Sequence, residues 1–364
     1  MTELAEVFRL HGPAYRTKFA GRIPRPHLRA MTAIESCRTP ARGGQVYLCK
    51  RCKDFRFSYH SCRNRHCPKC QGDEAARWLE RRQDLLLPAP TFLVTVTVPE
   101  ELRALVRSHA RALLDVLFRS SSAALRQLAR DPRLLGGEIG CLGVLHTWAR
   151  SLVFHPHVHY VVPGGALAGD TWRTVPRPGF LVPVEALSRI FRAKFRDAVL
   201  ELDRTNGTDH FSQVPSGTWR RPWVVHCKPV GDGTGALKYL ARYVFRVALG
   251  QNQIVSLQNG VVTFRYKDSE TGRNRTCPLP AEEFIRRFLQ HVLPHRFVKG
   301  RSYGLFARSH RARLDRARVL AARRASRAGL ATGPPPKPPR RPVDVCPRCQ
   351  TRMDLVGSVQ PRGP

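Results

Sequence analysis

The sequence predicts an α+β protein that has a mostly antiparallel sheet, a small zinc-binding module before it and a basic tail after it. β-Branched runs alternate with helical patterns along the middle of the chain, and most cysteines lie in one short N-terminal segment. Arg and Pro dominate the final segment. A chain of 364 residues, 42% of them hydrophobic, is long enough to bury the cores of two or three domains.

Two structural units are expected in the N-terminal part of the chain. Residues 1–36 form a helical lead-in that Gly and Pro interrupt. Residues 37–88 form a zinc-binding, DNA-binding domain that ends in a helix at 73–87, where acidic residues in the first turn suit the helix dipole. Pro88 and Pro90 then predict a domain boundary.

Residues 89–300 are expected to form one large domain, the candidate catalytic domain. The expected elements are a strand at 91–98, a long helix from 99 to about 129, strands at 138–148 and 154–163, a helix at about 184–203, a strand at 222–227 and a helix at about 234–248. This order is typical of an α+β domain with a mostly antiparallel sheet. A hairpin at 254–268, turning at Asn259-Gly260, and a helix at about 281–292 follow.

The tail, residues 301–364, is rich in Arg and contains the run PPPKPPRRP. Pro-rich, single-sign segments rarely bury enough apolar surface to pack. We therefore expect a solvated or DNA-contacting arm. It ends near a Cys-x2-Cys pair, Cys346 and Cys349, which supplies only half a metal site; its partners could be Cys37 and Cys62, or another molecule.

The charge predicts a polyanionic partner. Lys and Arg number 62 against 27 Asp and Glu, a net charge of +35, and such an excess neutralises phosphates. A GC-rich genome explains why Arg outnumbers Lys but not why acids are scarce. Nucleic acid is therefore the expected partner.

Neither a membrane span nor a secretory signal is predicted. The apolar runs are far shorter than the roughly 20 residues that a span needs, and the N-terminus is polar. We expect a cytoplasmic, nucleoid-associated bacterial protein. In that setting eleven cysteines, an odd number, favour metal binding over disulfides.

Two Cys-x2-Cys turns predict a structural zinc site. Its four expected ligands are Cys49, Cys52, Cys67 and Cys70. Four thiolates complete a tetrahedral shell and leave no open position for catalysis. Further candidates, which could form a second site or replace one of these ligands, are Cys37, His60, Cys62 and His66. The basic residues interleaved with them, expected to contact phosphates, are Arg63, Arg65 and Lys69.

Three alternating histidines predict a second kind of metal site. His155, His157 and His159 point to one face of the expected strand at 154–163. Neutral imidazoles at this spacing can converge on one divalent cation, although a lone histidine is more often a core residue. Pro156 weakens strand pairing beside His155, so His157 and His159 form the better pair. His146, on the neighbouring strand, is a candidate third ligand.

Tyr239 and Tyr243 lie one turn apart on the expected helix at 234–248. Aromatic pairs on helices often pack into cores, but here an apolar stripe lies opposite both phenols. That stripe contains Leu237, Leu240, Ala241, Val244, Val247 and Ala248. The cations on the tyrosine side are Lys238, Arg242 and Arg246. Phenols among cations suit attack on a phosphodiester, because the cations favour the phenolate and balance the phosphate charge.

Together these motifs resemble one family. The runs SCRNRHCPKCQ, VLHTW, FHPHVHYVVPGG, YLARY, FIRRFLQHVLP and YGLFARSHR, followed by the terminal CPRC, occur in an order that resembles the two-tyrosine HUH transposases of IS91-type insertion sequences. The resemblance covers nearly the whole chain. It implies an N-terminal zinc domain followed by an HUH-type catalytic domain with an antiparallel sheet.

The resemblance also implies the chemistry. His157 and His159 would hold Mg²⁺ or Mn²⁺, which polarises the scissile phosphate of single-stranded DNA at the element's ends. One tyrosine attacks to give a 5′-phosphotyrosine and a free 3′-OH, and two tyrosines allow two successive cleavages in a rolling-circle-like reaction. Members often carry His shortly after the second tyrosine, where this chain has Phe245.

Two other functions are compatible with these residues. One is a rolling-circle replication initiator with the same chemistry, and the other is a non-catalytic, zinc-dependent DNA-binding protein whose His and Tyr only pack. The zinc module and the order of motifs along the chain favour the transposase.

Overall fold

The computed structural model describes residues 3–149, 151–245, 249–268, 271–327 and 344–361. At its centre is a five-stranded sheet in the order β12-β4-β5-β3-β8, in which every neighbouring pair is antiparallel. Its strands are β3 (Thr91–Thr97), β4 (Gly140–Trp148), β5 (Phe154–Pro163), β8 (Val225–Pro229) and β12 (Gly300–Gly304). The predicted α+β class with a mostly antiparallel sheet is confirmed.

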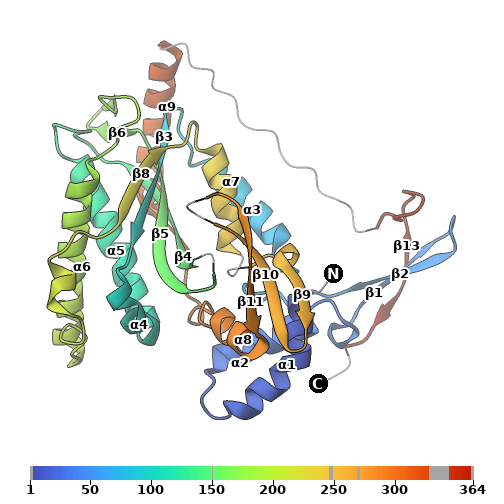
Figure 1. Cartoon of the computed structure of the whole chain (residues 1–364). Coiled ribbons are helices and arrows are strands. Elements are labelled where there is room, and N and C mark those ends of the chain that lie inside the picture. Colours follow the sequence, from blue (N-terminus) through green and yellow to red (C-terminus); the bar gives the residue numbers. More distant parts are fainter. Residues whose placement is uncertain (1–2, 150, 246–248, 269–270, 328–343, 362–364) are drawn as a thin grey trace.

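Helices cover both faces of this sheet. They are α3 (Gly72–Gln83), α4 (Glu100–Ser108), α5 (Ala110–Ala129), α6 (Val184–Asn206), α7 (Thr234–Val244) and α9 (Arg311–Arg327). Figure 1 shows α4, α5 and α6 on one side of the sheet and α3 and α7 on the other. Because strand residues alternate between faces, Val158 and Tyr160 of β5 enter the core with α5 and α6, whereas Val161 packs in the cluster that includes α7. His157 and His159 share the parity of Val161 and so belong to the α7 side.

The N-terminal helices do not form a separate lead-in. The elements α1 (Leu4–Lys18), α2 (Arg25–Ser36) and α8 (Ala281–Leu289) share one core with a small sheet of order β11-β10-β9. That sheet contains β9 (Ile254–Gln258), β10 (Val261–Lys267) and β11 (Asn274–Pro280). The β9–β10 hairpin turns at Asn259 and Gly260, both with positive φ, as the sequence predicts. Phe8 of α1 packs against Phe288 of α8, with ring centroids 5.3 Å apart.

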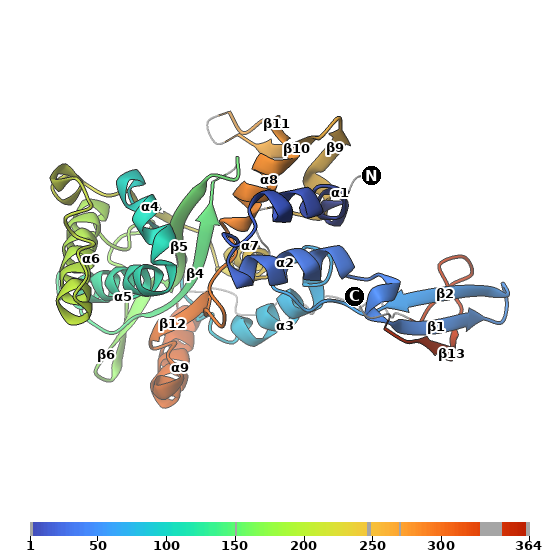
Figure 2. The ribbon, with the colours of Figure 1, turned by 90° about the horizontal axis from the view of Figure 1, so that it is seen from below.

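A narrow three-stranded ribbon joins the two ends of the chain. It consists of β1 (Gly44–Cys49), β2 (Asp54–Tyr59) and β13 (Asp354–Val359), in the order β13-β1-β2. Gly44 pairs with Val359 of β13, about three hundred positions along the chain. Figure 2 shows this ribbon projecting away from the central sheet.

The expectation of an unpacked tail is wrong for its described residues. β12 pairs with β4 at the edge of the central sheet, and α9 buries Leu314, Ala317 and Ala321. The tail then returns to the ribbon as β13. A high Arg content did not prevent packing, because small residues spaced along α9 form a buried stripe between the exposed arginines. The PPPKPPRRP run lies outside the described residues.

Other boundaries also differ from the prediction. The long helix after β3 is interrupted at His109 (φ −114°, ψ 42°), whose ring packs edge-on against His210 at 4.2 Å. The hairpin of β6 (Gly165–Ala168) and β7 (Thr171–Thr174) was not predicted, because four-residue strands show too little periodicity. Short 3-10 turns occupy Pro40–Arg42, Ser216–Trp219, Gln251–Gln253 and Arg308–His310. Among the described helices none is both long and apolar enough to cross a membrane.

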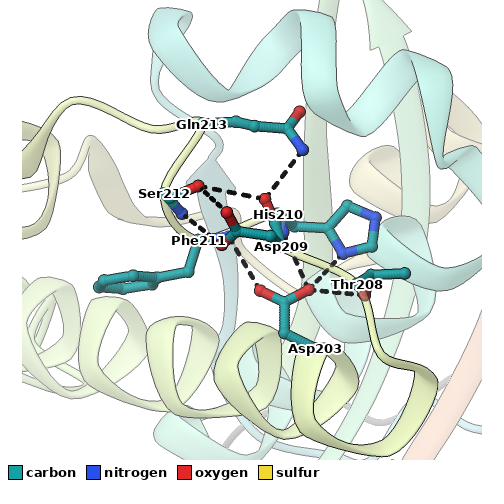
Figure 3. A network of polar contacts seen from close by, with 7 residues as sticks. All are labelled: Asp203, Thr208, Asp209, His210, Phe211, Ser212 and Gln213. Atoms are coloured by element: carbon teal, nitrogen blue, oxygen red, sulfur yellow. Dashed lines mark hydrogen bonds and ion pairs between the residues drawn. The ribbon is translucent and has the colours of Figure 1, made fainter.

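The carboxylate of Asp203, 11% exposed, holds the loop that follows α6. The helix ends at Gly207 in the left-handed conformation (φ 62°), and Asp203 then accepts hydrogen bonds from the next turn (Figure 3). Its Oδ1 accepts from the Thr208 hydroxyl at 2.7 Å and from the His210 backbone N–H at 3.0 Å, and its Oδ2 accepts from the Phe211 N–H at 2.8 Å. The loop is thereby held where Phe211 stacks on Trp219.

We expect Asp203→Ala to lower the free energy of unfolding by about 1–3 kcal/mol at pH 7, because buried donors lose their acceptor. Burial alone would raise the pKa of Asp203, but the N–H and hydroxyl donors outweigh it and lower the pKa below its ordinary value. The stabilisation is thus present above the ordinary pKa and is lost as the pH falls through the lower folded pKa. Denaturant unfolding should show the two proteins converging below about pH 4.

The matched control is Asp209→Ala in the same loop. The Asp209 carboxylate accepts from exposed Ser212, whereas Gln213 donates to the Asp209 backbone carbonyl, which the substitution keeps, so the change should cost less than about 0.5 kcal/mol. Equal losses from both variants would show that Asp203 has no special role in holding the loop.

Candidate functional site

Three histidines meet on the α7 side of the central sheet. Antiparallel pairing sets His146 of β4 directly opposite His157 of β5, and His159 lies two residues further along the same strand. Their ligand-capable nitrogens all lie within 4.8 Å of one another. His155 lies outside this group, although its ring centroid is 5.2 Å from that of His157. The structure thus brings together His146, His157 and His159.

A hydrogen bond fixes which nitrogen His157 presents, and the other two rings differ in their partners. Nδ1 of His157 lies 2.7 Å from the carbonyl oxygen of His155; because a carbonyl only accepts, Nδ1 carries the proton and Nε2 keeps its lone pair. Nδ1 of His159 lies 2.7 Å from the hydroxyl of Thr95 on β3. Such a second partner is what orients a metal-binding imidazole. Nε2 of His146 is buried and has no hydrogen-bond partner among the described residues.

The protein environment keeps these imidazoles neutral. Burial lowers the pKa of His157 to about 4, and burial together with the neighbouring imidazoles lowers the pKa of His146 and His159 well below the ordinary value. Neutral imidazoles keep the lone pairs that a cation requires. A divalent ion therefore fits the cluster, and it would supply the partner that Nε2 of His146 lacks.

The two tyrosines lie beside the histidines. The ring of Tyr243 is 4.6 Å from that of His146, and the ring of Tyr239 is 6.2 Å from that of His159. The two phenol rings are 4.6 Å apart. Tyr239 is 40% exposed, so one face of the pair is open to solvent.

The helix presents the tyrosines as the periodicity predicts. The stripe residues Leu237, Leu240, Ala241 and Val244 are buried against β4 and β5. Lys238 and Arg242 are exposed beside the phenols, where they can meet a polyanion. Arg246, Val247 and Ala248 lie outside the described residues.

Lys299 is a site residue that sequence reasoning missed. It precedes β12 as a single lysine without a motif, and only the fold brings it to α7. Its Nζ donates to the carbonyl oxygen of Tyr243 at 2.5 Å and lies 4.8 Å from the ring centroid of Trp148. Burial lowers the pKa of Lys299 to about 7. Trp148 in turn stacks on His146, with centroids 5.3 Å apart and planes 5° from parallel.

The cysteines form two clusters rather than one site. The first cluster contains Cys37, Cys62, Cys67 and Cys70, and the second contains Cys49, Cys52, Cys346 and Cys349. In each, four sulfurs lie within 4.8 Å of one another. The predicted grouping of Cys49 and Cys52 with Cys67 and Cys70 is therefore wrong, because the β1–β2 hairpin carries the first Cys-x2-Cys turn away to meet the C-terminal pair.

The clusters have the chemistry of metal sites, not of disulfides. All eleven cysteines are free, and the close pairs Cys62–Cys70 and Cys49–Cys349 have sulfurs 3.6 and 3.5 Å apart, far beyond an S–S bond. His60 and His66 are not in either cluster. His60 is exposed, whereas Nε2 of buried His66 accepts the backbone N–H of Leu293 at 3.2 Å and so ties the module to the segment after α8.

Three basic residues that lie between the cysteines of the zinc module have different environments. Lys69 pairs with Glu3 of the N-terminal segment, and the Arg65 guanidinium donates to the carbonyl oxygen of Phe297. Arg63 is exposed. Two of the three cations that the sequence assigned to phosphates are therefore engaged within the protein.

Two protein families match this chain, one over its N-terminal part and one over its central part. Residues 7–98 match the family described as "Transposase zinc-binding domain", and residues 140–313 match the family described as "Putative transposase". The first match contains the whole first cysteine cluster but ends before Cys346. The second contains all three site histidines, both tyrosines and Lys299.

Two named relatives cover most of the chain. It is 40% identical over 324 residues to the "Putative transposase y4qJ" of Sinorhizobium fredii, covering 85% of this chain and 81% of the relative. It is 27% identical over 295 residues to the "Transposase for insertion sequence element IS801" of Pseudomonas savastanoi pv. phaseolicola, covering 76% and 69%. No solved structure matches. Both family matches and both relatives agree, and the chain belongs to the IS91-type family of insertion-sequence transposases.

Proposed function

We propose that this transposase cuts and rejoins single-stranded DNA by the HUH mechanism, through a 5′-phosphotyrosine. The observation that carries the proposal is the meeting of three neutral histidines with two tyrosines in one partly open site. The substrate would be the single-stranded ends of the mobile element and its target, cut in a rolling-circle-like reaction. Such a protein works where chromosomal DNA is, at the bacterial nucleoid.

The metal of this site would be held by His157 and His159, with His146 as the third ligand. The buried, unpartnered Nε2 of His146 supports that assignment. Phe245 occupies the position near the second tyrosine where similar transposases often carry His, so β4 rather than α7 would supply the third nitrogen. When bound, Mg²⁺ or Mn²⁺ would polarise a phosphate oxygen as a Lewis acid.

The chain's own residues would perform the transfer. The Oη atom of Tyr239 or Tyr243 forms a bond to phosphorus while the bond from phosphorus to the 3′ oxygen breaks, and the phenol proton is transferred overall to that oxygen. The phosphodiester energy is kept in the phosphotyrosine, so rejoining needs no nucleotide cofactor. Lys238 and Arg242 would neutralise the phosphates, and Lys299 would hold the end of α7 that carries Tyr243.

A rolling-circle replication initiator would use the same chemistry. The zinc domain and the transposase relatives favour transposition. A non-catalytic DNA-binding protein would not need two phenol rings centred 4.6 and 6.2 Å from neutral imidazoles.

Incubation with labelled single strands of the element's ends and Mn²⁺ should give a covalent protein–DNA adduct that resists boiling in detergent. Tyr239→Phe/Tyr243→Phe should abolish it, because no phenol remains to attack. Tyr266→Phe, the same change on β10, should leave the adduct intact. A wild-type protein that forms no adduct with any divalent ion would sink the nuclease mechanism and leave DNA binding alone.

Replacing a histidine of the cluster tests the metal. His159→Ala should slow adduct formation by more than about 100-fold, since Lewis-acid stabilisation is worth several kcal/mol. His146→Ala should raise the Mn²⁺ concentration needed for half-maximal rate. His155→Ala is the matched control: it lies on the same strand, and its backbone carbonyl, which orients His157, remains. If all three variants respond alike, the cluster is not the metal site.

The two cysteine clusters would each hold one structural Zn²⁺. Native mass spectrometry should therefore find two Zn²⁺ per chain, and Cys346→Ser/Cys349→Ser should lose one of them. Because the second ion would tie β13 to β1, amide exchange in β1 should quicken in that variant. Cys277→Ser, outside both clusters, should keep both ions. Retention of two ions by the double variant would contradict the second site.

A further inference from the structure

A charged cleft lies where the zinc module meets the catalytic domain. It encloses about 830 Å³ between the loop at 61–65, helix α3, the end of α7 and residues 297–300. That volume lies within the range of roughly 300–1,000 Å³ that ligand pockets occupy. The first cysteine cluster forms part of its wall through Cys70, and neighbouring Gln71 secures the loop by donating to the carbonyl oxygen of Asn64 at 2.8 Å.

The lining carries an excess of positive charge. The cations are Arg63, Arg65, Arg77, Arg82 and Lys299, and the acids are Asp73 and Glu74. Glu74 is paired with Arg77. Arg65 and Lys299 donate to backbone carbonyls of Phe297 and Tyr243, so these bonds hold the two side chains in place.

Two features point to a ligand in this cleft. The Nε atom of Arg82 is buried yet makes no hydrogen bond within the described part of the chain. Two aromatic side chains also line the cleft, half-buried Phe245 and Trp78 of α3, which is 6% exposed. Arginines interleaved with aromatic rings are the composition of surfaces that bind the backbone and bases of a single strand.

The cleft lies at the C-terminal end of α7, the helix that carries both tyrosines. Val244 and Phe245, which line it, directly follow Tyr243 in the chain, and Lys299 spans from the lining to the carbonyl oxygen of Tyr243. A strand bound at the tyrosines and running past the end of α7 would reach this cleft. Helix α3 packs alongside α7 and so supplies the far wall.

The shape selects among DNA forms. Proteins read a duplex by inserting a helix or ribbon into a groove some 12 Å wide, which requires a protruding element. A concave cleft with aromatic walls instead suits a few unstacked nucleotides. We propose that this cleft binds the stretch of single-stranded DNA next to the scissile phosphate, and that the zinc module thereby holds the substrate strand. The proposal rests on the function proposed above and names where its substrate lies.

Binding is best measured without cleavage, in the full-length Tyr239→Phe/Tyr243→Phe protein with both zinc ions. The probe is a labelled oligothymidylate of about twelve nucleotides, titrated over a salt series, with a duplex of equal length for comparison. Adding Arg63→Gln/Arg82→Gln should weaken oligothymidylate binding about tenfold. It should also reduce the slope of log K against log salt by about 1.4, because each phosphate that an arginine no longer neutralises lowers the slope by about 0.7.

The matched control is Arg51→Gln/Arg81→Gln, which removes the same charge from exposed positions outside the cleft. It should weaken binding by less than about twofold, because solvent screens surface charges that do not line the cleft. Equal effects of both pairs would overturn the cleft proposal, and so would a larger effect on the duplex than on the single strand.

A second measurement does not depend on the variants folding. When a complex of the wild-type protein with an iodouracil-containing oligonucleotide is irradiated, the oligonucleotide should cross-link to a peptide that contains Trp78 or Phe245. Cross-links confined to the ribbon strands would overturn the proposal. If the cleft proposal is wrong, the wild-type protein still forms the phosphotyrosine adduct. If no adduct forms but Arg63→Gln/Arg82→Gln still weakens DNA binding, the nuclease proposal is refuted and the cleft proposal stands.

Discussion

The antiparallel pairing of β4 with β5 is the constraint on which the site depends. It sets His146 against His157 and, with its two-residue repeat, points His159 to the same face. A slip of one residue would turn all the β5 histidines into the core beside α5 and α6. The register is secured because Val158, Tyr160 and Val162 already occupy that core, fully buried. Packing on one face of the sheet therefore fixes the chemistry on the other.

The remaining parts act by holding α7 over those histidines. The apolar stripe of α7 packs on the sheet, and α3 packs alongside α7. Lys299 donates a hydrogen bond to the carbonyl oxygen of Tyr243 in the last turn of α7. Lys299 in turn belongs to the segment leading into β12, and Arg65 of the zinc module bonds to Phe297 in that segment. The cysteine module is thus connected to the tyrosines through a few side chains. A metal bound by the first cysteine cluster would in this way help to hold α7 in place through its surrounding residues.

Sequence patterns succeeded where the deciding interactions are local. His157 and His159 share a face because a strand alternates, and Tyr239 and Tyr243 share one because a helix repeats every 3.6 residues. The same local rules predicted the Asn259-Gly260 hairpin and four of the five described central strands, but not β12. They failed for Cys49 and Cys52, whose partners lie almost three hundred residues away, and for α9, whose buried stripe is hidden among arginines. Lys299 carries no pattern at all.

The sequence alone thus determined the kinds of chemistry present: thiolate clusters, paired imidazoles, paired phenols and a large positive charge. Spacing along a strand or helix also decided which of these residues point the same way. Only the tertiary structure decided which cysteines meet, which third histidine joins the pair, and that a cleft with arginine and tryptophan walls lies beside the second tyrosine. Those outcomes depend on contacts between distant segments, and no periodicity encodes them, because the free energy of packing is shared over whole surfaces.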